Sequence, residues 1–280
     1  MADATDSSLP RLAFVGGGNM ARSLIGGLVR RGAAPGRIAV AEPNAELRER
    51  LAADYGVAVQ ADGAGAAADA EVIVLAVKPQ VMRLVCEALR PIVQQTRPLL
   101  ISIAAGIRLD QLDAWCGGGL AVVRSMPNTP ALIGAGASGL CANARVTPEQ
   151  RRSAEAVLGA AGLTTWIDAE EHMDIVTALS GSGPAYFFLL VEALEDAAVA
   201  QGLPREAARQ LATQTALGAG RMLAEDGEAP AKLRERVTSP GGTTQAAIDC
   251  FLTRGLREIV ADAVAAATQR GRELAAGSGS

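Results

Sequence analysis

Histidine and lysine are almost absent from this chain of 280 residues, and aromatic residues make up only 3% of it. The lone histidine is His172, and the lysines are Lys78 and Lys232. The 4 cysteines lie far apart, without C-x-x-C spacing or nearby histidines, so a structural zinc site is excluded. A disulfide scaffold is also excluded, because such scaffolds are short and dense in cysteine. We therefore expect no metal site and a reducing compartment.

The chain also lacks blocks of like charge and uninterrupted apolar runs. Its net charge is -4, with 26 basic and 30 acidic residues, so we expect no nucleic-acid partner. Residues 1–8 lack the basic start and apolar run of a signal peptide. A long uncharged and apolar stretch, 175–191, carries Ser-Gly-Ser-Gly-Pro at 180–184, which would interrupt a spanning helix. We therefore expect a buried core helix there, no membrane partner and a cytoplasmic location.

Short runs rich in valine and isoleucine alternate with amphipathic stretches from Arg11 to about Asp168. This alternation is typical of βαβ units in an α/β fold with a mostly parallel sheet. Strands are predicted at 12–15, 38–41, 57–59, 72–77, 99–103, 121–124, 138–141 and 164–167. Helices are predicted at 20–31, 45–54, 79–89, 109–115 and 148–161, with Asn44 and Thr147 as two caps. We assign residues 10–168 to this domain.

The pattern changes after Glu170, where no further strand is predicted and long helices rich in alanine and leucine follow. They are expected at 174–200 with a kink at Pro184, at 205–224, at 231–237 and at 244–273 with a break near Gly255, before a flexible tail at 277–280. We assign residues 169–275 to an all-helical C-terminal domain. The run at 187–191 is apolar on every side and needs a partner, so we predict oligomers formed through this domain.

A glycine-rich turn follows the first predicted strand, where Gly16-Gly17-Gly18-Asn19-Met20-Ala21 matches G-x-G-x-x-A before a helix. Gly16 permits the tight turn, Gly18 lets the backbone approach a pyrophosphate, and Ala21 permits close packing. The helix start adds amide donors and a positive dipole. The turn indicates a dinucleotide site, and the alternative is a glycine-rich turn without a ligand.

An acidic residue, Glu42, ends the second predicted strand, about where the dinucleotide motif places the carboxylate that binds a ribose 2'-hydroxyl. A carboxylate there repels a 2'-phosphate, which favours NADH over NADPH. Arg48 and Arg50 lie about one helical turn away and could receive a phosphate if Glu42 points aside. A solvated loop residue is the alternative interpretation.

Removal of a hydride from an alcohol needs a general acid or base for the hydroxyl proton, usually His, Lys or Tyr. The chain offers few of these: His172 is expected at a surface or a helix start, and the long central helix has no lysine. A C=N substrate relaxes this demand, because an imine is protonated far more readily than a ketone. Imine reduction is therefore the chemistry most compatible with these residues.

A second loop with chemical content, Ser239-Pro240-Gly241-Gly242-Thr243-Thr244, leads directly into a predicted helix. Consecutive glycines and hydroxyl residues at a helix start form a small anion site. A carboxylate-bearing substrate fits such a site, and an ordinary capping turn is the alternative.

Six blocks in order, from about Arg11 to Leu274, resemble pyrroline-5-carboxylate reductases. That family makes L-proline by reducing the cyclic imine 1-pyrroline-5-carboxylate with NAD(P)H, the last step of proline biosynthesis. The blocks are Val15 to Ala21, Ala76 to Pro79, Ser102 to Gly106, Met126 to Pro130, Ser180 to Tyr186 and Ser239 to Thr244. The resemblance implies a Rossmann domain and a helical domain that forms a homodimer, often assembled further into a decamer.

The resemblance also implies roles for residues in these blocks. The residues implied to bind the cofactor are Val15, Gly16, Gly17, Gly18, Asn19, Met20, Ala76, Val77, Lys78, Pro79, Ala104, Ala105 and Gly106, with Glu42 added from the strand pattern. The residues implied to bind the substrate are Ser239, Gly242, Thr243, Thr244 and Glu170. Thr244 is the catalytic candidate, because its hydroxyl would bond the ring nitrogen. Lys78 has the alternative of a surface lysine, and Glu170 that of a solvated loop residue.

Two departures from the family concern the coenzyme. Many members carry serine or threonine where Glu42 stands, so the family implies NADPH while Glu42 leaves NADH open. An asparagine common after the third strand is replaced here by Asp62-Gly63. Two rival functions stay open, another Rossmann enzyme with a helical dimerisation domain and a nucleotide-sensing protein without catalysis.

Overall fold

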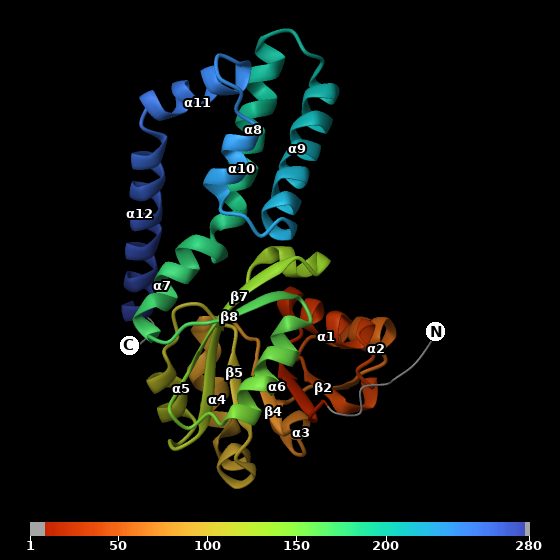
Figure 1. Cartoon of the computed structure of the whole chain (residues 1–280). Coiled ribbons are helices and arrows are strands. Elements are labelled where there is room, and N and C mark those ends of the chain that lie inside the picture. Colours follow the sequence, from red (N-terminus) through yellow and green to blue (C-terminus); the bar gives the residue numbers. More distant parts are fainter. Residues whose placement is uncertain (1–8, 278–280) are drawn as a thin grey trace. The chain divides into compact units, whose positions relative to one another are not determined.

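The computed structural model describes residues 9–277. Contacts divide the chain into two units: one runs to Gly181 and resumes at Ala267, and the other covers Ser182–Ala266 (Figure 1). The expectations about residues 1–8 and about the tail at 278–280 lie outside the described residues. The division of function between 10–168 and 169–275 stays a prediction.

The first unit is built on an 8-stranded sheet in the order β3-β2-β1-β4-β5-β6-β7-β8. Every neighbouring pair is parallel except β6 and β7. The strands are β1 (Leu12–Val15), β2 (Ile38–Ala41), β3 (Ala58–Gln60), β4 (Val72–Leu75), β5 (Leu99–Ser102), β6 (Ala121–Met126), β7 (Gly136–Ala142) and β8 (Gly162–Trp166). An order that reverses between β1 and β4 is that of a Rossmann fold, so the predicted fold class is confirmed.

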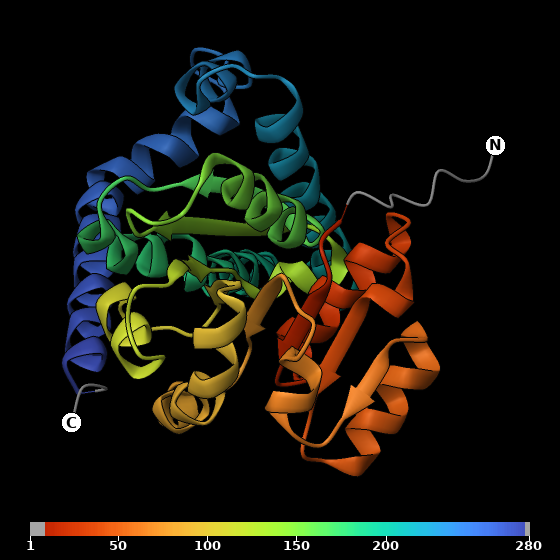
Figure 2. The ribbon, with the colours of Figure 1, turned by 90° about the horizontal axis from the view of Figure 1, so that it is seen from below.

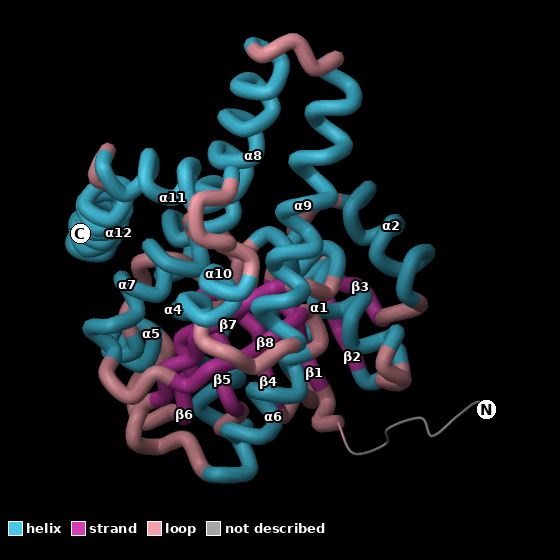
Figure 3. Tube along the Cα trace, turned by 45° about the horizontal axis from the view of Figure 1, so that its top comes forward, coloured by secondary structure: helices cyan, strands magenta, loops and turns pink. Residues whose placement is uncertain are grey.

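Helices cover both faces of this sheet (Figures 2 and 3). Side chains alternate along a strand, so Phe14 packs in the core under α1, α2 and α6, while Ala13 packs in the core under α3, α4 and α5. The two buried faces explain the continuous apolar runs in the sequence. The helices are α1 (Asn19–Arg30), η1 (Pro35–Arg37), α2 (Ala45–Tyr55), α3 (Gly63–Ala67), α4 (Pro79–Thr96), α5 (Leu109–Trp115), η2 (Thr129–Ile133), α6 (Pro148–Gly159), η3 (Glu170–His172), α7 (Met173–Val176) and the π-helical turn η4 (Thr177–Gly181).

The end predicted at Leu89 for the helix that starts at Pro79 is wrong, because α4 continues through Pro91 to Thr96. Met82, Leu89 and Val93 are buried on one face of α4. Burial of this continuous apolar stripe outweighs the hydrogen bond that Pro91 cannot donate.

Capping side chains start three of the helices. Asn44 and Thr147 each accept a hydrogen bond from the backbone N–H three residues ahead, as predicted. Asp62 does the same for α3, a short helix that was not predicted. The acidic residue that departs from the family pattern at this position is therefore used as a helix cap.

The second unit is helical. Glu195 lies between its first two helices, accepting hydrogen bonds from Arg209 at 3.1 Å and from Arg205 at 2.9 Å. The hydrogen bonds from Arg209 and then Arg205 lower the pKa of Glu195, so its carboxylate stays charged and links the two helices. The helices are α8 (Gly183–Ala200), α9 (Arg205–Glu225), α10 (Pro230–Arg236), α11 (Thr243–Thr253) and α12 (Leu256–Gly277), whose last part belongs to the first unit.

The apolar helix α8 is exposed in the single chain. The prediction of a buried core helix is therefore wrong for the single chain. Phe187 is 66% exposed and Leu189 is 65% exposed. The reason is that the run 187–191 of α8 is apolar on every side, while α9 covers one side of the helix. Among the described residues, the helical stretch Glu170–Ala200 is long and apolar enough to cross a membrane, a test that core helices of soluble proteins also pass.

Candidate functional site

The carboxyl ends of the central parallel strands meet at one edge of the sheet. Val15 pairs with Ala41 on one side and with Leu75 on the other, so β1, β2 and β4 end level with one another. Ligands of open α/β sheets bind at this edge, where the strand order reverses. The predicted residues after β1, β2, β4 and β5 are thus brought together, although they are as far apart in sequence as Gly16 and Gly106.

The first two glycines of the glycine-rich turn are required by the protein itself. Gly16 has a φ of 102°, and a Cβ there would lie 2.5 Å from the carbonyl oxygen of Ala76. A Cβ on Gly17 would lie 2.6 Å from a methyl group of Leu51. The positive φ of Gly16 lets the chain turn sharply between β1 and α1, while at Gly17 the side chain of Leu51 fills the space that a Cβ would take.

Unlike Gly16 and Gly17, Gly18 is not required by the fold. It is the N-cap of α1, with a φ of -67° that any residue adopts, and no atom lies within 4 Å of the position that a Cβ would take. No side chain caps the start of α1, and its first turn has no acidic residue. Open space beside uncapped helix amides suits an anion such as a pyrophosphate, and Asn19 and Met20 are the first residues of this helix, while their contact with a coenzyme stays a prediction.

Glu42 is buried and points toward the glycine-rich turn. One carboxylate oxygen accepts a hydrogen bond from the Gly17 N–H at 2.9 Å, and the other accepts one from the Asn44 N–H at 2.9 Å. The residue is 8% exposed, so it is not the solvated loop residue of the alternative interpretation. The Arg48 guanidinium is held by the carbonyl oxygens of Glu42 and Pro43 at 2.7 and 2.8 Å.

Two further predicted segments lie at the same edge. Ala76 continues the strand ladder by donating to the Val15 carbonyl at 2.8 Å, and the exposed Lys78 follows as the N-cap of α4, with Pro79 as its first residue. After β5, Ala104 is buried and Ala105 is exposed. Both segments can contact a ligand through backbone and small side chains.

The loop before α11 forms a helix start suited to an anion. Gly241 has a φ of 71°, and the Gly242 N–H donates to the Ser239 carbonyl at 3.0 Å. Gly242 is the N-cap of α11, without a side-chain cap and without an acidic residue in the first turn. The first bond of the helix is Ala246 N–H to Gly242 oxygen, so the amides ahead of it are the available donors. Gly242 thus closes the turn, while its predicted contact with substrate stays a prediction.

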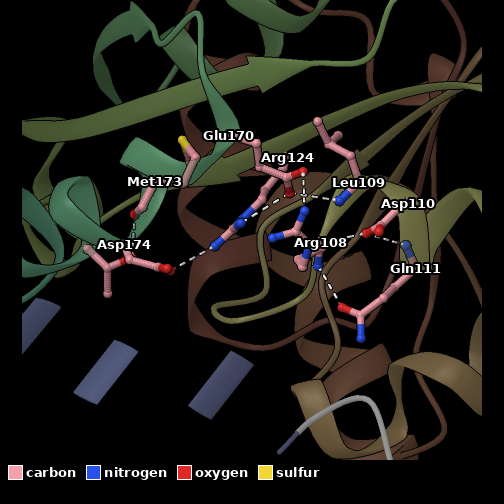
Figure 4. Close-up of polar contacts among 9 residues, drawn as sticks. Arg108, Leu109, Asp110, Gln111, Arg124, Glu170, Met173 and Asp174 are labelled. Atoms are coloured by element: carbon pink, nitrogen blue, oxygen red, sulfur yellow. Dashed lines mark hydrogen bonds and ion pairs between the residues drawn. The ribbon is translucent and has the colours of Figure 1, made fainter. Parts of the chain in front are cut away.

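Glu170 is engaged by the protein's own groups (Figure 4). Its Oε1 accepts a hydrogen bond from the Leu109 N–H at 2.8 Å and one from Arg124 at 3.1 Å. A second nitrogen of Arg124 donates to Asp174 at 3.3 Å. The solvated alternative is wrong, because the Glu170 side chain is only 16% exposed. Its contact with substrate stays a prediction.

Arg124 was not predicted as a functional residue, although the sequence carries a signal for it. Arg124 is a charged residue within the apolar strand β6, and a charge buried there needs a partner. His172 is exposed at the start of α7, as predicted. Within residues 9–277, no three side chains of His, Cys, Asp or Glu come together to hold a metal ion.

Two family models match the chain. One, described as pyrroline-5-carboxylate reductase dimerisation, matches residues 170–274, and one, described as NADP oxidoreductase coenzyme F420-dependent, matches residues 11–106.

Relatives match over nearly the whole length. The pyrroline-5-carboxylate reductase of Pseudomonas aeruginosa is 51% identical over 96% of this chain and 98% of its own. The structure of a pyrroline-5-carboxylate reductase from Coxiella burnetii has a TM-score of 0.93 and is 43% identical, covering 95% of this chain and 98% of that one. The Plasmodium falciparum pyrroline carboxylate reductase with NADP bound has a TM-score of 0.81 and is 29% identical, with 95% and 98% covered.

Proposed function

The chain belongs to the pyrroline-5-carboxylate reductase family, and from this premise we propose that it reduces 1-pyrroline-5-carboxylate to L-proline with NAD(P)H. The observation that carries the proposal is identity of 51% over 96% of the chain. Two features of the geometry support the proposal: the helix start at Gly18 has open space that suits a dinucleotide, and the helix start at Thr243 has no side-chain cap, which suits a carboxylate. The test is oxidation of the reduced coenzyme in the presence of the imine.

The proposed substrate site is the start of α11. The free amides at Thr243 and Thr244, aided by the Ser239 hydroxyl, bind the substrate carboxylate, since a helix N-terminus favours an anion. Gly242 shapes the turn that presents these donors. The Thr244 hydroxyl bonds the ring nitrogen and orients the imine, and orientation of this kind supplies much of the rate. The reduced nicotinamide supplies the hydride when bound.

NADH is the coenzyme that we propose as preferred. Glu42 places a buried carboxylate at the end of β2, held by two backbone N–H groups. There it accepts a hydrogen bond from a ribose 2'-hydroxyl and repels a 2'-phosphate. Arg48 is already bonded to backbone carbonyls, which makes it a weaker receptor for that phosphate. The NADP-bound relative differs from this chain at most positions, with 29% identity.

The proposed working form is a cytoplasmic homodimer. The segment 170–274 matches a dimerisation model, and it carries the exposed residues of α8. A second copy would remove this apolar surface from water, which is the main driving force for such association. Further assembly to a decamer follows from the family resemblance and is part of the same proposal.

Replacing Thr244 with valine is expected to lower kcat/KM for the imine by about tenfold or more, because one hydrogen bond to the ring nitrogen is lost while the side chain keeps its shape. Steady-state kinetics at saturating coenzyme measure this effect. The control is Thr253→Val at the other, exposed end of α11, which should leave both constants unchanged. Unchanged kcat and KM in Thr244→Val would remove the hydroxyl from the mechanism.

A further inference from the structure

A cluster of charged side chains joins strand β6 to the loop after β5 (Figure 4). Arg124 is at its centre, with a side chain that is 5% exposed, and it faces the carboxylates of Glu170 and Asp174. The exposed Arg108 lies at the edge, 4.0 Å from the second Glu170 oxygen. Burying such a cluster contributes little net stability, because desolvation offsets the attraction between the charges. A role in placing a neighbouring segment therefore explains it better than stability does.

That neighbouring segment is the loop 103–108. At its far end, the N–H of Leu109, the first residue of α5, donates to Glu170 Oε1. In its middle, Gly106 has a φ of 75° and faces the backbone of Ala275 near the end of α12, 3.5 Å from where a Cβ would be. At its start, Ile103 continues the strand ladder to the Leu75 carbonyl at 3.2 Å. The loop is therefore held by hydrogen bonds at both ends, with further bonds from Ala104 N–H to Ser102 Oγ and from Arg108 N–H to Gln111 Oε1, and Glu170 supplies the bond from a charged side chain.

We propose that Glu170 is a positioning residue for the loop 104–106, oriented for this task by Arg124. The inference rests on the proposed function and on the family resemblance, which implies that Ala104, Ala105 and Gly106 bind the coenzyme near its nicotinamide end. Both donors reach the same oxygen of Glu170, so Arg124 fixes the atom to which the loop is tied. Glu170 then acts on the reaction through the backbone of the loop, without touching the substrate.

A matched pair of variants isolates this role. Glu170 and Asp174 are both partners of Arg124, with side chains 16% and 15% exposed, but only Glu170 bonds the Leu109 amide. Alanine at position 174 also keeps the Cβ atom that faces Gly271. A general effect of breaking the cluster would therefore appear in both variants, and an effect on the loop would appear in Glu170→Ala.

The test compares NADH with ADP-ribose, which lacks the nicotinamide. For Glu170→Ala we expect the Kd for NADH to rise and kcat to fall, each by about tenfold, because a loop displaced by about 1 Å misplaces the reacting ring. The Kd for ADP-ribose should stay unchanged, as should all constants of Asp174→Ala. Glu170→Gln keeps an oxygen that can accept from Leu109, so it should restore NADH binding.

Three results would overturn the proposal. Equal losses of NADH affinity and of kcat in Glu170→Ala and Asp174→Ala would show a general role of the ion cluster. Equal weakening of NADH and ADP-ribose would show a collapse of the whole unit. A change confined to KM for the imine would show the substrate contact instead. The binding measurements need no turnover, so failure of the proposed reaction in the unaltered protein is distinguishable from failure of this inference.

Discussion

Gly18→Ala should bind NADH about a hundredfold more weakly than the unaltered protein, a loss of about 2.7 kcal/mol, while folding almost as stably. The backbone at Gly18 accepts alanine, and no atom of the protein occupies the place of the added methyl group. The methyl group would instead occupy the space through which the backbone approaches the pyrophosphate. Because alanine is a weaker N-cap than glycine, a melting temperature about 2–4 °C lower is the most that we expect.

Two other glycines serve as controls for this prediction. Gly36 also has no atom within 4 Å of a Cβ but lies in η1, before β2, so Gly36→Ala should change neither binding nor stability. Gly27 has the Ala160 carbonyl oxygen 2.2 Å from its Cβ position, so Gly27→Ala should destabilise the fold. Titration of NADH fluorescence measures binding, and thermal melts of each variant measure stability, so the two effects are separated. Full affinity for NADH in Gly18→Ala would contradict a pyrophosphate site at Gly18.

Glu42→Ser is expected to shift the ratio of kcat/KM for NADPH over NADH upward by about a hundredfold, or about 2.7 kcal/mol. Removing the carboxylate ends the repulsion of a 2'-phosphate in a site shielded from water, where two like charges interact strongly. It also removes the acceptor for a 2'-hydroxyl, which lowers the rate with NADH. Steady-state kinetics with both coenzymes measure the ratio.

The control for this substitution is Glu49→Ser, which removes an exposed carboxylate from the middle of α2. It should leave the coenzyme ratio within about twofold, since charges exposed to solvent are screened. If Glu42→Ser left the ratio unchanged, its carboxylate would be a part of the turn alone, bonded to Gly17 and Asn44, with no effect on the choice of coenzyme.

Local patterns in the sequence predicted the sheet and most helices. Strands such as β1 and β4 are continuous apolar runs between turn residues, and the caps Asn44 and Thr147 mark helix starts. Errors arose where packing outweighed a local signal. Pro91 predicts a helix end, but the buried stripe of α4 continues past it.

The candidate site was only partly predictable. The glycine pattern identifies the turn, but it does not separate Gly16, which the fold needs, from Gly18, which the fold does not. That difference depends on the position of Ala76, which follows β4, the strand that pairs with β1. The carboxylate of Glu170 similarly finds its partners Leu109 and Arg124 far away along the chain. Such long-range contacts leave no periodic pattern in the sequence.

The most direct measurement of the central claim is the loss of reduced-nicotinamide absorbance with racemic 1-pyrroline-5-carboxylate, run in parallel with NADH and NADPH. We expect turnover that depends on the imine, with equal amounts of L-proline formed and a higher kcat/KM for NADH. Turnover with NADPH favoured would retain the reaction and contradict the role of Glu42. No turnover with either coenzyme, from folded and oligomeric protein, would contradict the proposed function itself.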